Sequence, residues 1–265
     1  MYKSDFVIDT HAHLFDNENL IETRRILKDS ARAHNISFTL VSFAVSERTV
    51  DEKAKHSFRS SLNFLLKMCK TYDDFGMLIW IKPRKSQSTI QLEKFIIKNR
   101  KYIYGLKIHP YYSQIKMDDK RIIPFIKLAE KLDLPILVHT ATDEYSRVKI
   151  LAKVAKKYKK VKFIAAHLEL ETSHEEALNY IKDIPNLYGD TAWVSIKTIV
   201  RAKELKILDK IMFGTDNPID GINTLDNDIY AKYYENMIHL NKENISKIMY
   251  KNAMNIYKIS EEKLK

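Results

Sequence analysis

Eight short apolar segments rich in β-branched residues alternate with longer amphipathic stretches, and this alternation limits the fold more than any other feature of the sequence. The apolar segments cover residues 6–13, 38–45, 76–83, 103–110, 135–140, 161–169, 187–193 and 210–218. The intervening stretches repeat apolar residues at i, i+3 and i+4, the spacing of a helix face, as in 19–35, 89–101, 122–132 and 145–160. Repeated strand and helix units are typical of a parallel sheet covered by helices.

Eight such units predict an α/β fold closed into a (β/α)₈ or TIM barrel, for which about 250 residues is an ordinary length. An open, doubly wound sheet is the alternative architecture. No Pro- or Ser-rich linker, low-complexity tract or close repeat divides the chain, so we expect a single domain over residues 1–265. Extra C-terminal helices are expected over 224–240 and 243–259, packed outside the barrel or closing one end.

Composition excludes several classes of protein. Cys69 is the only cysteine, which forbids an internal disulfide and suits a reducing compartment. With five glycines, the chain has no glycine-rich loop of the P-loop or dinucleotide-binding type. Residues 1–13 lack the pattern of a signal peptide, and no apolar run approaches the roughly 20 residues of a membrane span. We therefore expect a cytoplasmic protein without a membrane partner.

The formal net charge is +11, from 45 Lys and Arg against 34 Asp and Glu, which would suit an anionic partner such as nucleic acid. The lysines are spread along the chain, however, and alternate with apolar residues at helical spacing, as in 151–160. Solvated helix faces explain that pattern better than a nucleic-acid patch. We expect a small-molecule substrate, and the sequence leaves the formation of a homo-oligomer open.

Ionisable residues gather where the predicted strands end. They are His11 and His13 on the first strand, Lys107 and His109 on the fourth, His139 on the fifth, His167 on the sixth and Asp216 on the eighth. Residues i and i+2 of a strand share a face, so His11 and His13 point the same way. Since parallel barrel strands end at one mouth, where barrel enzymes place their catalytic groups, these side chains should form one site.

Several imidazoles with a carboxylate suit Zn²⁺, and also Mn²⁺, Fe²⁺ or Co²⁺. A lone histidine in an apolar strand is more often a satisfied core residue, but five of nine histidines fall at strand ends. The other four, on helices or loops, are expected to be exposed: His34, His56, His174 and His239. Asp9 is interpreted as a supporting hydrogen-bond group. Lys107 is either a buried ammonium paired with a carboxylate or a catalytic, even carboxylated, lysine.

The segments DTHAH, GLKIHP, PILVHT, AAHLE and FGTDNP, in this order, together resemble the amidohydrolase superfamily and its amidohydrolase-related branch. The C-terminal KIMYKNAMNIYKI is similar to that branch's closing segment, so the resemblance covers nearly the whole chain. It implies a barrel with one or two divalent metals at its mouth. His11, His13 and Asp216 would bind the buried metal, and His139 would be a further ligand. His167 would be a second-metal ligand or an acid/base group, and Lys107 falls where dihydroorotase-like members carry a carboxylated lysine.

The chemistry expected is hydrolysis, because a divalent metal lowers the pKa of bound water to about 7 and Asp216 can accept its proton. An amide, cyclic amide or lactone would fit. Substrate contacts are expected from His109, Tyr111, Tyr112, Trp193 and Arg48.

A decarboxylase or hydratase of the same branch is the nearest alternative, since a metal also stabilises an enolate-like intermediate. A TatD-like deoxyribonuclease would use the positive charge, but GLKIHP stands where that family carries a segment resembling GEIGLDY. The third alternative is a metal held only for structure, although such sites are usually closed by four ligands, often cysteines.

Overall fold

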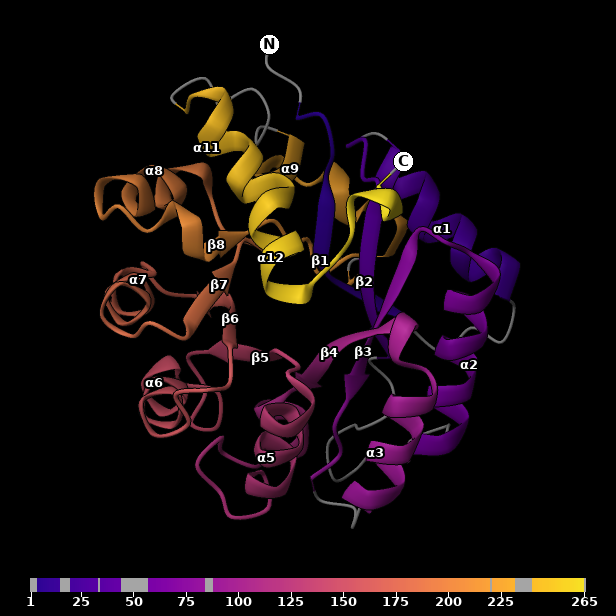
Figure 1. The fold of residues 1–265 in the computed structure, drawn as a ribbon. Coiled ribbons are helices and arrows are strands. Elements are labelled where there is room, and N and C mark those ends of the chain that lie inside the picture. The colour runs from indigo at the N-terminus through magenta and orange to yellow at the C-terminus, as the bar shows by residue number, and fades with distance from the viewer. Residues whose placement is uncertain are drawn as a thin grey trace.

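The computed structural model describes residues 4–14, 20–32, 34–43, 57–83, 88–219, 221–231 and 240–264. Eight parallel strands form one sheet in sequential order, with helices around its outside (Figure 1). The strands are β1 (Ile8–Leu14), β2 (Phe38–Phe43), β3 (Phe75–Trp80), β4 (Ile103–Ile108), β5 (Ile136–Ala141), β6 (Phe163–Leu170), β7 (Leu187–Asp190) and β8 (Ile211–Met212). Each overlaps one of the eight segments predicted from the sequence.

Backbone contacts between β1 and the β8 segment, which comprises residues 211–217, close the sheet. The amide of Thr10 donates to the carbonyl of Phe213 at 3.0 Å, and Ala12 forms a parallel bridge with Asn217. The (β/α)₈ barrel predicted from the sequence is therefore confirmed, and the open doubly wound sheet is wrong.

Helices follow most strands, as the alternation predicted. They are α1 (Leu20–Arg32), α2 (Phe58–Thr71), α3 (Thr89–Lys98), α4 (Pro110–Ser113), α5 (Ile123–Leu132), α6 (Val148–Lys157), α7 (Glu175–Asp183), α8 (Ile196–Glu204), α9 (Asp228–Ala231), α11 (Lys242–Ser246) and α12 (Asn252–Tyr257). A π-helical turn, η6 (Lys247–Lys251), joins α11 to α12, and a 3₁₀ segment, η4 (Gly221–Asp226), precedes α9. No helix among the described residues is long and apolar enough to cross a membrane.

The C-terminal segment closes the end of the barrel at which the strands begin. Side chains inside the barrel, such as Ile8, Leu40 and Met212, form one buried cluster with Ile256 and Tyr257 of α12. A second, larger cluster lies between the strands and the surrounding helices. Because α12 covers the beginnings of the strands, the opposite end, where the strands finish, is left to hold a site.

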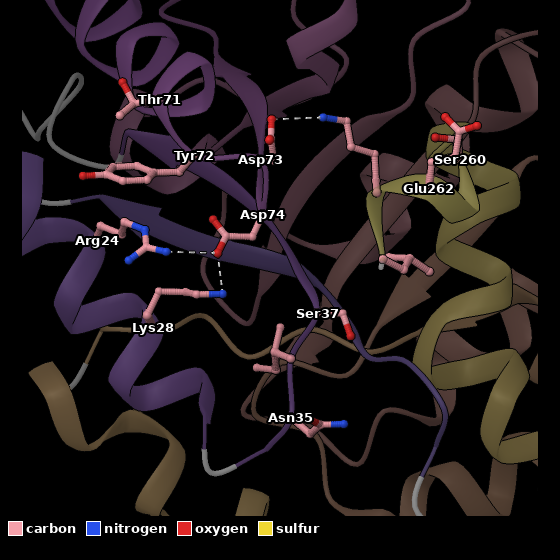
Figure 2. Close-up of a pocket in the computed structure, with 13 residues that line it drawn as sticks. Arg24, Lys28, Asn35, Ser37, Thr71, Tyr72, Asp73, Asp74, Ser260 and Glu262 are labelled. Atoms are coloured by element: carbon pink, nitrogen blue, oxygen red, sulfur yellow. Dashed lines mark ion pairs between the residues drawn. The ribbon is translucent and has the colours of Figure 1, made fainter.

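A polar cavity of about 830 Å³ lies near the same end as α12, between α1, the turn that follows α2 and the C-terminal segment (Figure 2). Five of its six charged lining side chains form ion pairs with one another. Lys28 and Arg24 both pair with Asp74, and Lys263 lies 3.7 Å from Asp73. These ion pairs tie the C-terminal segment and α1 to the α2–β3 turn.

Register shifts alter which residues face the barrel interior. The pairing of β1 with β2 shifts between Asp9 and Ala12. Ile8 and His11 therefore both lie inside the barrel, although residues three apart would ordinarily face opposite ways. The pairing of β3 with β4 shifts between Met77 and Leu78, and that of β5 with β6 between His139 and Ala141.

Candidate metal centre

Two imidazoles of β1 and a carboxylate that follows β8 meet at the barrel mouth. Asp216 Oδ1 lies 2.8 Å from His13 Nε2 and 3.2 Å from His11 Nε2. Asp216 reaches back to β1 because its backbone is left-handed, with φ 63°, and its amide donates to the carbonyl of His11 at 2.7 Å. Each of the three side chains is largely buried, so water competes weakly for them.

The hydrogen bonds of His11 fix where its proton lies. His11 Nδ1 is 2.9 Å from Asp190 Oδ2, and an ionised carboxylate only accepts, so Nδ1 carries the proton. Nε2 then presents a lone pair toward Asp216 Oδ1, another lone-pair atom, only 3.2 Å away. Two lone-pair atoms this close repel each other unless positive charge lies beside them, and this is an environment that a metal ion fits.

Charge and burial set the ionisation of this group. Burial, followed by the nearby Lys107, lowers the pKa of His11 to about 3, so its imidazole is neutral. Burial alone would raise the pKa of Asp216, but His11 and His13 hold it well below its usual range. Neutral imidazoles beside an ionised carboxylate are the forms that bind a divalent cation.

Lys107 supplies a cation in the present arrangement. It is fully buried on β4, and its Nζ donates to His11 Nε2 at 2.7 Å. Burial lowers the pKa of Lys107 to about 8, although Asp216 and Asp190 oppose the shift. The amine therefore loses its proton more easily than an exposed lysine does, which carboxylation requires.

His139 and His167 form a second histidine pair beside the first. His167 Nδ1 donates to the carbonyl of Ala192 at 3.1 Å, so His167 Nε2 is free to accept from His139 Nδ1, also at 3.1 Å. The ring of His167 lies 4.9 Å from that of His11, centre to centre. The sequence-predicted residues of β1, β4, β5, β6 and β8 are thus brought together.

Two groups of potential ligand atoms lie within 4.8 Å of one another among the described residues. One consists of His11, His13 and Asp216, and the other of His11, His167 and Asp190. His139, which the resemblance implied as a ligand, belongs to neither group and contacts the site through His167.

An unusual backbone turn presents His167. Three consecutive residues without a glycine, His167, Leu168 and Glu169, have left-handed φ angles of 66°, 48° and 67°. Such residues cost about 1–3 kcal/mol each unless the surroundings hold them. Here the amide of His167 donates to Asp190 Oδ1 at 2.9 Å, and the amide of Glu169 donates to Thr140 Oγ1 at 2.9 Å.

Aromatic rings line one side of the mouth. Trp80 of β3 stacks on His109 with centroids 5.4 Å apart, and His109 stacks on His139 at 3.8 Å. Tyr112 lies 4.2 Å from His109, whereas Tyr111 is 46% exposed at the rim. Planar faces next to the ionisable groups suit an unsaturated or ring-containing ligand.

Trp193 contacts the carboxylate directly. Its Nε1 donates to Asp216 Oδ2 at 3.2 Å, and its amide donates to the hydroxyl of Tyr230 at 2.8 Å. The same hydroxyl donates to the carbonyl of Thr215 at 2.6 Å. Tyr230 therefore fixes both Trp193 and the backbone beside Asp216.

The remaining sequence expectations concern Arg48 and the four histidines that were expected to be exposed. His34 was expected to be exposed, which is wrong: it is buried, with Nε2 3.0 Å from the carbonyl of Leu225 in η4. His174 is partly buried, and its Nδ1 is 3.0 Å from the carbonyl of Leu168. Arg48, His56 and His239 lie outside the described residues.

Sequence reasoning missed Asp190, Trp80 and Tyr230. Asp190 lies within the predicted strand at 187–193, and an acidic residue in this otherwise uncharged segment is a signal that could have identified it. Trp80 lies inside the predicted strand at 76–83, where the sequence does not distinguish it from a core residue. Tyr230 lies in a stretch that was assigned to packing alone.

A (β/α)₈ barrel that gathers imidazoles and carboxylates at the carboxyl ends of its strands has the layout of a metal-dependent barrel enzyme. The amidohydrolase family model (Amidohydro_2) matches residues 8–259, and the chain belongs to this family. It is therefore an enzyme of the metal-dependent, amidohydrolase-like class.

Solved structures support the same fold. A 5-carboxyvanillate decarboxylase of Novosphingobium aromaticivorans, complexed with manganese, has a TM-score of 0.69 at 12% identity, covering 96% of each chain. Dihydroorotase of Campylobacter jejuni gives 0.60 at 20% identity, over 96% of this chain and 83% of that one. An Acinetobacter baumannii protein assigned as a 2-pyrone-4,6-dicarboxylic acid hydrolase gives 0.63 at 13% identity, over 96% and 99%. No curated protein gives a significant match.

Proposed function

We propose that the chain, acting as one barrel domain over residues 1–265, is a cytoplasmic metal-dependent hydrolase of a small molecule with a carbonyl-type carbon, such as a lactone, an amide or a cyclic amide. The observation that carries this proposal is the pair of lone-pair atoms, His11 Nε2 and Asp216 Oδ1, that face each other 3.2 Å apart. A divalent cation between them would lower the pKa of a water molecule and polarise a carbonyl.

Zinc is the metal that we propose, with manganese, iron or cobalt as alternatives, because imidazole and carboxylate ligands suit all four. His11, His13 and Asp216 are the proposed core ligands, and their donor atoms lie within 4.8 Å of one another. His139 and His167 are proposed as additional ligands, His139 for the same ion and His167 for a second one. A carboxylated Lys107 would accompany the second ion.

Asp216 has the arrangement of a proton acceptor. Its Oδ2 takes one hydrogen bond, from Trp193 Nε1 at 3.2 Å, while Oδ1 faces the imidazoles. We propose that Asp216 takes a proton from the attacking water and returns it to the leaving group.

His167 stands across the site, with its ring 4.9 Å from that of His11. We propose that His167, once Nε2 as well as Nδ1 carries a proton, donates from Nε2 to the oxyanion that develops when the water attacks, if it does not hold a second metal. His109, Tyr111 and Trp193 are proposed to contact the substrate. The stacking of His109 with Trp80 would leave a planar surface beside the reacting carbon.

Decarboxylation is the second candidate, and the position of Lys107 favours it. A buried ammonium 2.7 Å from His11 could protonate the carbon that loses carbon dioxide. Two of the structurally similar enzymes named for their reaction, the 5-carboxyvanillate and 2,6-dihydroxybenzoate enzymes, are decarboxylases.

The test is to load the purified protein with Zn²⁺ or Mn²⁺ and assay lactones, cyclic amides and hydroxybenzoates separately. Lactone hydrolysis releases a proton, which a pH-stat detects, whereas decarboxylation releases carbon dioxide. Asp216→Asn should abolish turnover while leaving the thermal midpoint of the metal-free protein close to that of the parent. Equal loss of folding and turnover would contradict the catalytic role, and turnover without metal would contradict the proposal.

The metal count separates the two versions of the site. Elemental analysis of chelator-free protein should be compared among the parent, Lys107→Ala and His167→Ala. Two ions that fall to one in both variants support a carboxylated Lys107 and hydrolysis. One ion that survives both changes makes these two residues groups that face the substrate and favours decarboxylation.

A further inference from the structure

Asp190 contacts both His11 and His167, and no sequence motif or comparison assigns it a role. It ends β7 and is fully buried. Oδ2 accepts from His11 Nδ1 at 2.9 Å, while Oδ1 accepts from the amides of His167 at 2.9 Å and Ala192 at 3.1 Å. Both oxygens are therefore committed to hydrogen bonds before any metal binds.

This bonding pattern argues against Asp190 as a metal ligand, although it lies near His11 and His167. The two backbone amides occupy both lone pairs of Oδ1, and the N–H of His11 takes one of the two on Oδ2, so three of the four lone pairs of the carboxylate already hold protein donors. Three N–H donors surround the carboxyl group: the imidazole of His11 and the amides of His167 and Ala192. Facing these donors, the carboxylate accepts at both oxygens.

We propose that Asp190 is a positioning residue that sets the tautomer of His11 and anchors the left-handed turn carrying His167. By holding the proton of His11 on Nδ1, it directs the Nε2 lone pair at the site. By accepting the amide of His167, it holds the first residue of a turn that would otherwise be strained. One side chain thereby fixes both His11 and His167, an inference that rests on the proposed metal site.

Gly214 makes this contact sterically feasible. It lies between β1 and β7, where a Cβ atom would stand 3.0 Å from His11 Cβ and 3.3 Å from Asp190 Cβ and Cγ. Any side chain at this position would push the imidazole and the carboxylate apart. The absence of one lets β7 reach β1 past the β8 segment.

The test measures Mn²⁺ binding by calorimetry to chelator-treated parent, Asp190→Asn and Glu169→Gln. In Asp190→Asn, the amide oxygen can still accept both backbone amides, which leaves the NH₂ group facing His11 Nδ1. His11 must then move its proton to Nε2, and the Kd for Mn²⁺ should rise about 10–100-fold. Glu169 is the matched control, because it is also buried but contacts Arg147 and the amide of Val148 rather than an imidazole.

A second readout needs no metal. Long-range proton–nitrogen correlation spectra of ¹⁵N-histidine protein distinguish the two tautomers, and a His11→Gln spectrum identifies the signal. The parent should have the Nδ1–H form of His11 and Asp190→Asn the Nε2–H form. An unchanged tautomer, a Kd within about threefold of the parent, or an equal loss in Glu169→Gln would each overturn the proposal.

If Asp190→Asn does not fold, Gly214→Ala takes its place, because it separates the same two groups while keeping the carboxylate. It should weaken Mn²⁺ binding and perturb the His11 signal, and parent-like behaviour in both would overturn the proposal. Should the parent itself bind no Mn²⁺, the proposed function fails, while the tautomer spectra still decide the role of Asp190.

Discussion

Two buried tyrosines make a matched pair for testing how the C-terminal region supports the site. The hydroxyl of Tyr230 accepts from the amide of Trp193 at 2.8 Å and donates to the carbonyl of Thr215 at 2.6 Å. The hydroxyl of Tyr257, in α12, is buried with no hydrogen-bond partner among the described residues. Tyr→Phe removes the same atom from each, so any difference reports the hydrogen bonds rather than the ring.

Tyr230→Phe should be clearly destabilising. It leaves a backbone N–H and a backbone carbonyl without their partner, and each buried group left unsatisfied costs about 1–3 kcal/mol. A loss of about 2–6 kcal/mol in the free energy of unfolding follows, which for a chain of this size lowers Tm by about 4–11 °C. Tyr257→Phe should change stability by less than about 1 kcal/mol, in the stabilising direction, because an unsatisfied hydroxyl is removed.

Urea denaturation measures both variants, with the midpoint taken as stability only where the slope m is unchanged. Mn²⁺ affinity is the second measurement, because Tyr230 holds the backbone beside Asp216 and its loss should also weaken binding. Equal changes in the two variants would refute the reasoning. So would a Tyr230→Phe protein within about 0.5 kcal/mol of the parent, since the two bonds would then have no net value.

Three further predictions follow from particular contacts. Burial raises the pKa of Cys69 to about 12, so a thiol reagent should not react near pH 8 until denaturant exposes one equivalent. Gly189→Ala should cost about 1–3 kcal/mol in urea denaturation, because its Cβ would lie 2.2 Å from a methyl of Leu168 and 3.0 Å from one of Ile181. Mn²⁺ at about 100 times its Kd should stabilise the parent by about 2.7 kcal/mol, and Asp216→Asn should lose most of that increase in Tm.

The strands could be predicted because each is a short apolar run between longer amphipathic ones. Their ends could not always be placed. The eighth segment was predicted over 210–218, but β8 covers only Ile211–Met212. Beyond Met212 the chain bends across β1, and Asp216 adopts a left-handed φ of 63°. Neither the bend nor the φ angle leaves a periodic signal in the sequence.

Alternation along a strand predicted which side chains face the interior only where no bulge intervened. Lys107 faces inward, as expected, but Tyr104, three residues earlier, also belongs to the cluster inside the barrel. The register shift between β3 and β4 explains this difference. Met77 pairs with Ile103 but Leu78 pairs with Gly105, so Tyr104 is an extra residue on β4. Counting back from Lys107 would have placed Tyr104 outside, so parity is reliable only within one uninterrupted stretch.

Histidines at strand ends stand out in a sequence because each is unusual by itself, whereas a supporting carboxylate is recognised only through its partner. Asp190 and His11 are separated by 179 positions, and their contact depends on Gly214, which follows both in the chain. The left-handed turn at His167 also depends on Asp190. Because Asp190 was not identified from the sequence, neither this turn nor the tautomer of His11 could be predicted. A sequence can therefore indicate which groups meet at a barrel mouth. It does not indicate which nitrogen of His11 carries the proton, because Asp190 sets that position and comes near His11 only in the closed barrel.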